Sequence, residues 1–85
     1  METAPHTAWP STVWYVELRG KEAEATLRQW LEQLPGQAGF AGAELLDSPA
    51  QPGLALVASH WSGPLPELTP PAGAKHWTFR VLAQR

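Results

Sequence analysis

The chain has no cysteine, little charge and no long apolar run, and each absence excludes a class of protein. Without cysteine, its 85 residues can form no disulfide framework, thiolate nucleophile or cysteine-ligated metal site. Six Lys and Arg against eight Asp and Glu leave a net charge of −2, whereas nucleic-acid binding needs clustered cations. No apolar run reaches the ~18 residues of a membrane span, and METAPHTAWPST lacks the basic and apolar regions of a signal peptide. We therefore expect a soluble cytoplasmic protein with neither nucleic acid nor membrane as a partner.

The three histidines show no spacing typical of a zinc site, so we expect no metal and no metal cofactor. They are His6, His60 and His76. A domain of this length buries only roughly 60–65% of the surface that its unfolded chain exposes, so its core is marginal. Small domains compensate with disulfides, metals or a partner subunit. Association is the remaining source of stability.

Five tryptophans are present, an unusually high number for so short a chain. Tryptophan favours places where one edge of the ring is apolar and the other edge meets a polar partner. Two interpretations stay open: the indoles fill a thin core, or they line a ligand pocket.

The pattern of the first half predicts an arm, a strand and a helix. Residues 1–10 contain two prolines and no periodicity, which predicts a flexible arm before one domain over residues 11–85. Residues 12–18, TVWYVEL, have the β-branched and aromatic content of a strand. Residues 21–34 place Ala23, Leu27, Trp30, Leu31 and Leu34 on one apolar stripe, which predicts a helix ending at Pro35-Gly36.

The second half predicts three further strands, over residues 39–46, 54–61 and 76–82. Four prolines between residues 62 and 75 leave room for at most a short helical turn. The order is that of a ferredoxin-like βαββ(α)β plait, an α+β fold with an antiparallel sheet and strand order 4-1-3-2. Because one helix cannot cover both apolar faces, we expect a homodimer through the other sheet face.

Five segments resemble the antibiotic-biosynthesis-monooxygenase (ABM)-like domains of the dimeric α+β barrel superfamily. They are VWYVEL, EAEATLRQWLEQL, PGQAGFAGAELL, LALVASHWS and FRVLAQ, and the resemblance covers about residues 12–83. It implies two sheets that close face to face into a barrel. The second helix of that family, which walls the substrate pocket, is shortened or lost here. The family's heme-degrading branch uses an Asn, a Trp and a His. Trp61 matches the Trp, Val13 stands near the Asn position and no helix carries the His, so heme degradation is not implied.

The quinol- and anthrone-oxidising branch uses neither metal nor flavin, because its deprotonated substrate reduces O₂ itself. For this chain the resemblance implies a small aromatic or phenolic ligand in an aromatic pocket between sheet and helix. His60 is the candidate catalytic base, since imidazole titrates near neutral pH. The candidate substrate-binding residues are Trp14, Trp30, Phe40, Trp61, Trp77 and Phe79.

Several alternatives accompany this hypothesis. His60 alternates with Trp61 and therefore points to the other face, where it is also typical of a satisfied or interfacial histidine. If Trp77 and Phe79 face the helix, Glu17 and Arg80 share a face, where we expect either an ion pair inside or at the rim of the barrel or a solvated pair that contributes little. The chain is either a cofactor-independent monooxygenase or a non-catalytic dimeric ligand-binding or structural module. An RNA-binding plait shares the topology but requires basic charge that is lacking here.

Overall fold

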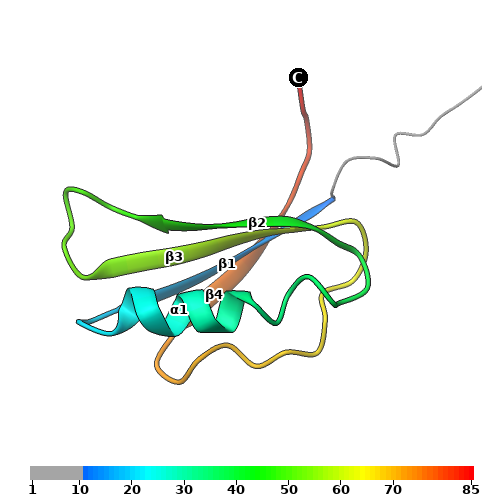
Figure 1. Cartoon of the computed structure of the whole chain (residues 1–85). Helices are drawn as coiled ribbons and strands as arrows, with labels where there is room; N and C mark the ends of the chain where they lie inside the picture. Colours follow the sequence, from blue (N-terminus) through cyan, green and yellow to red (C-terminus); the bar gives the residue numbers. More distant parts are fainter. Residues whose placement is uncertain (1–10) are drawn as a thin grey trace, which may run out of the picture.

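The computed structural model describes residues 11–85, and the arm predicted for residues 1–10 lies outside the described residues. Within that range the chain is an α+β structure with one helix and one four-stranded antiparallel sheet (Figure 1). The elements are β1 Thr12–Arg19, α1 Ala23–Leu31, β2 Phe40–Asp47, β3 Leu54–Trp61 and β4 Lys75–Arg80. The predicted strands are confirmed with ends that move by one or two residues.

The strand order is β2-β3-β1-β4, so the two central strands are β1 and β3. Every neighbouring pair is antiparallel. This order is the predicted 4-1-3-2 arrangement, and it is compatible with a ferredoxin-like plait. The pairing between β2 and β3 shifts register between Phe40 and Gly42, where Gly42 has a φ of 140° that side-chain-bearing residues rarely adopt.

Helix α1 covers one face of the sheet because its apolar stripe faces the strands (Figure 1). Ala23, Leu27 and Trp30 are buried there. The helix is shorter than predicted, since the chain passes after Leu31 into hydrogen-bonded turns that keep Leu34 fully buried. The apolar period therefore continues beyond the helical hydrogen bonds. Helix α1 packs against β1, β2 and β3 but not against β4.

Residues 62–74 join β3 to β4 without a helix and run on the same side of the sheet as α1 (Figure 1). Leu65, Leu68 and Ala74 pack against the core. The Nε1–H group of Trp30 donates a hydrogen bond of 3.0 Å to the carbonyl oxygen of Thr69. This proline-rich segment thus covers part of the face where a second helix of the plait would lie.

Side-chain alternation divides the sheet into a helix-side face and an open face. Trp14 and Val16 of β1 are buried on the helix side. Trp77 is paired with Tyr15, and Phe79 with Val13, so both aromatic rings lie on the open face. The predicted ion pair between Glu17 and Arg80 assumed that Trp77 and Phe79 face the helix, and this assumption was wrong. The register of β4 on β1 fixes this, because residues directly opposite each other lie on the same face and Trp14 is paired with Thr78.

Candidate functional site

Four of the six aromatic residues predicted to bind substrate lie together on the helix-side face. Trp14 comes from β1, Trp61 from β3, Trp30 from α1 and Phe40 from the start of β2. Trp14 meets Trp30, and Phe40 meets Trp61, each pair edge to face with ring centroids 5.4 Å apart. Trp14, Trp30 and Trp61 are exposed by only 3%, 5% and 0%. These four aromatic residues therefore pack in two edge-to-face pairs, and the three indoles belong to the buried core.

The polar edges of the indoles are satisfied inside the protein. Nε1–H of Trp61 donates to Oγ of Ser59 at 2.8 Å, and that hydroxyl donates to the carbonyl oxygen of Trp14 at 3.2 Å. Ser59 is completely buried. Nε1–H of Trp14 lies 3.4 Å from Nδ1 of His76, a long contact. Buried polar groups need such partners, so this arrangement is typical of a structural core.

The other two predicted aromatic residues, Trp77 and Phe79, lie on the open face and do not join the first four. Their exposed fractions are 42% and 53%. Phe79 meets Tyr15 of β1 edge to face, with centroids 5.5 Å apart. Five further apolar residues share this face with charged and polar ones: Val13 on β1, Leu46 on β2, and Leu54, Leu56 and Ala58 on β3. The six aromatic side chains are thus divided between the two faces of the sheet.

His60 also lies on the open face, as the alternation with Trp61 predicts. Its Nε2 atom is 3.0 Å from Oε1 of Glu44 on the neighbouring strand β2. The side chains of His60 and Glu44 are 29% and 56% exposed. His60 shares its cross-strand row with Val13 and Phe79. A carboxylate beside an imidazole fixes the orientation of the ring, which serves a binding role and a proton-transfer role equally well. The sequence alternation placed His60 correctly, but Glu44 was not identified as its partner.

The predicted ion pair between Glu17 and Arg80 does not form. Glu17 lies on the open face, opposite Lys75, whereas Arg80 is paired with Thr12 on the helix-side face. Glu17 instead lies 3.6 Å from Arg19. The prediction failed because it assigned Trp77 and Phe79, and with them the whole of β4, to the wrong faces.

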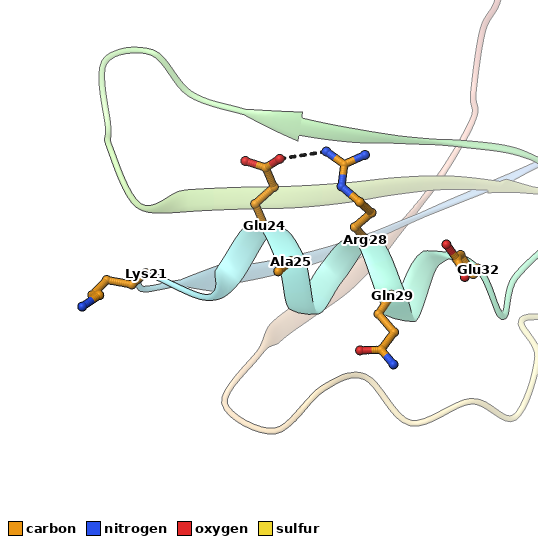
Figure 2. A pocket seen from close by; sticks show the side chains of 6 residues that line it. All are labelled: Lys21, Glu24, Ala25, Arg28, Gln29 and Glu32. Carbon is orange, nitrogen blue, oxygen red and sulfur yellow. Dashed lines mark hydrogen bonds and ion pairs between the residues drawn. The ribbon is translucent and has the colours of Figure 1, made fainter.

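Two hollows in the described part of the surface lie away from the predicted aromatic residues. One of about 390 Å³ follows the exposed side of α1 and is lined by Lys21, Glu24, Ala25, Arg28, Gln29 and Glu32 (Figure 2). Arg28 bonds Glu24 across it at 2.7 Å. A larger hollow of about 730 Å³ lies where Gly20 approaches Gly53, and it mixes Arg19 and Lys21 with Glu24 and Asp47. Neither hollow contains any of the predicted site residues.

Within residues 11–85, no group of three or more His, Asp or Glu side chains could hold a metal ion. His60 and His76 are on opposite faces, paired with Val13 and Val16 respectively, so they do not share a ligand site. Among the same residues no helix is long and apolar enough to cross a membrane. Comparisons with protein-family models, with curated proteins and with solved structures give no match to this chain.

Proposed function

We propose that this chain is a non-catalytic ligand-binding or structural module that acts as a homodimer, with two copies packed open face to open face. The observation that carries the proposal is the open face itself. Trp77, Phe79 and Leu46 are 42%, 53% and 44% exposed there. Antiparallel sheets that face water alternate apolar residues inward with polar residues outward. In this sheet apolar residues predominate on both faces.

Two further features favour a second copy as the occupant of this face. The core of a chain this small is marginal, and burying the open face would add a second apolar layer. Sheets pack face to face at about 10 Å, so two copies would interdigitate their large side chains. The charged groups of this face, among them Glu17, Glu44 and Lys75, include both signs, so two identical faces need not repel each other.

We also propose that the module is an ABM-like dimeric α+β barrel from which the active-site helix has been lost. Its support is the strand order, the single helix on one face and the loop at residues 62–74 where that family has a helix. The helix-side aromatic residues are packed in mutual contact and buried. This packing favours the non-catalytic alternative over a pocket between sheet and helix.

Analytical ultracentrifugation of wild type and Phe79→Lys tests the dimer. We expect the wild type to sediment as a dimer at micromolar concentration and Phe79→Lys as a folded monomer, because a cation in the apolar interface is desolvated without a partner. Leu82→Lys is the matched control. Leu82 follows β4 and is 87% exposed, so the same change in charge there should leave the dimer intact. A wild type that stays monomeric and folded would refute the proposal.

A cofactor-independent monooxygenase is the second candidate, and the His60–Glu44 pair favours it. In a dimer, that pair would lie beside Phe79 and Tyr15 between the two sheets, not under α1. His60 would take the proton of a phenol, and the phenolate would reduce O₂ directly, giving a quinone and water. This candidate predicts protein-dependent O₂ uptake with phenols or quinols that His60→Gln abolishes and His76→Gln preserves. Uptake no faster than in protein-free buffer would dismiss it.

A further inference from the structure

Among the residues that the structure describes, no strand pairs with the outer edge of β4. Within residues 11–85, β4 pairs only with β1. The register identifies the outward-facing groups. Val81 donates its N–H to the carbonyl oxygen of Ser11, and the bonded pairs of an antiparallel ladder alternate. Lys75, Trp77 and Phe79 therefore direct their N–H and C=O groups toward β1. The backbone groups of the alternate residues, His76, Thr78 and Arg80, point away from the sheet.

The two edges of the sheet differ in how they resist a further strand. Proteins protect edges with bulges, prolines and charges. Strand β2 has its register shift between Phe40 and Gly42, which interrupts a regular ladder. Strand β4 contains neither proline nor register shift in its six residues, KHWTFR. Its outward groups are thus available to an added strand, with only its charges to select which strand binds.

The side chains of β4 define the chemistry of such a strand. All six residues are exposed. The strand contains Lys75, Arg80 and His76 and no carboxylate, so its charge is positive. On the open face, Trp77 and Phe79 provide an apolar row. On the helix-side face, His76, Thr78 and Arg80 form a polar and cationic row. A neighbouring strand meets these two rows with alternate residues.

We propose that the outer edge of β4 binds an extended acidic peptide by β-strand addition. The peptide alternates apolar residues, which pack beside Trp77 and Phe79, with carboxylates, which face Arg80 and His76. Main-chain hydrogen bonds to His76, Thr78 and Arg80 provide affinity, and the alternating side chains provide specificity. This site is separate from the open-face dimer, because a strand added at the edge extends the sheet sideways and leaves the face in place.

A second copy of the chain fits this edge less well than a peptide does. Pairing β4 with β4 of another copy would bring Lys75, His76 and Arg80 together with like charges, which destabilises cross-strand pairs. Pairing β4 with β2 of another copy would bring acidic Glu44 and Asp47 to the cations, but the register shift at Gly42 disrupts the ladder. An independent acidic strand has neither drawback.

A fluorescein-labelled heptapeptide, Glu-Val-Glu-Val-Glu-Val-Glu, tests the proposal by fluorescence anisotropy with the full chain. We expect saturable binding that weakens with salt, and at least tenfold weaker binding of the Lys-Val-Lys-Val-Lys-Val-Lys analogue. A composition-matched peptide with the order Glu-Glu-Glu-Glu-Val-Val-Val should also bind weakly, because it lacks the alternation. Equal binding of the three peptides, or no binding of the first, overturns the proposal.

Thr78→Pro probes the main-chain contact, because the N–H of Thr78 points outward and proline is tolerated at such edge positions. We expect roughly tenfold loss of peptide affinity for Thr78→Pro and wild-type affinity for Thr78→Val, which keeps the N–H. Arg80→Glu gives a second route if Thr78→Pro unfolds, and it should weaken binding by roughly fivefold or more. Wild-type affinity in Arg80→Glu and in a folded Thr78→Pro contradicts the proposal.

Sedimentation distinguishes this site from the dimer. If Thr78→Pro converts a wild-type dimer to monomer without peptide, the edge binds a second copy and the peptide proposal is wrong. If the wild type is monomeric yet binds the heptapeptide, the open-face dimer fails and the edge site stands.

Discussion

The two faces of the sheet are both rich in large apolar side chains, yet only one of them is enclosed. Trp61, on the helix side, is fully buried, with its ring against Phe40 and its N–H on Ser59. Trp77, on the open side, is 42% exposed. The difference comes from what covers each ring, because α1 and residues 62–74 lie on one side only. Aromatic residues are therefore found both in the core and at a candidate interface. The two differ only in whether α1 and residues 62–74 lie over them.

Replacing one tryptophan on each face by alanine should give the largest difference in the free energy of unfolding between the two faces. Trp61→Ala should lower the free energy of unfolding by about 3–5 kcal/mol, because it leaves a large cavity in the core. Trp77→Ala should lower it by only about 1 kcal/mol. Both changes are measured by urea denaturation in the Phe79→Lys background, so that association does not contribute. Equal losses would show that the open face is also a core within the monomer.

Removing the buried hydroxyl of Ser59 should have an intermediate effect on the free energy of unfolding. Ser59→Ala removes the acceptor of the Trp61 N–H and should cost about 1–3 kcal/mol, since a buried donor is left unsatisfied. Ser62→Ala is the matched control. Ser62 is exposed and its hydroxyl makes only a long contact of 3.4 Å with Gly39, so its loss should stay within about 0.5 kcal/mol. A Ser59→Ala variant as stable as Ser62→Ala would contradict the structural role of this network.

The smallest effect is expected on the outer side of α1. Arg28 and Glu24 form an i,i+4 ion pair of 2.7 Å, but their side chains are 63% and 64% exposed. Arg28→Gln should lower the free energy of unfolding by about 0.3–0.5 kcal/mol, and 1 M salt should abolish the difference. A loss of more than about 1 kcal/mol would mean that the side chains lining the hollow along this helix (Figure 2) stabilise the fold as core residues do.

Local patterns in the sequence were sufficient to predict the strands and the helix, and the strand order followed from the plait topology that their succession indicates. The stripe from Ala23 to Leu34 gave the buried side of α1, and the alternation around Trp61 correctly separated it from His60. The helix was predicted too long because Leu34 continues the apolar period after the helical hydrogen bonds have ended. Periodicity reports burial, and a turn can bury a residue as well as a helix does.

The face of β4 could not be predicted because it depends on register and on the reach of α1. Trp77 and Phe79 form the more apolar row of that strand, so hydrophobicity alone assigned them to the helix side. In the fold, α1 spans β1, β2 and β3 but not β4, and pairing with Tyr15 and Val13 fixes the opposite assignment. The contact between His60 and Glu44 depends on the pairing of β2 with β3, which local sequence does not specify.

The single hydrogen bond from Trp30 to Thr69 has a consequence for how the missing second helix is replaced. Residues 62–74 contain Pro64, Pro66, Pro70 and Pro71. Each fixed pyrrolidine ring restricts the unfolded chain, so less conformational entropy is lost when this segment is laid over the indoles. A proline-rich segment with one hydrogen bond near its middle can thus cover part of a core that a second helix would otherwise cover.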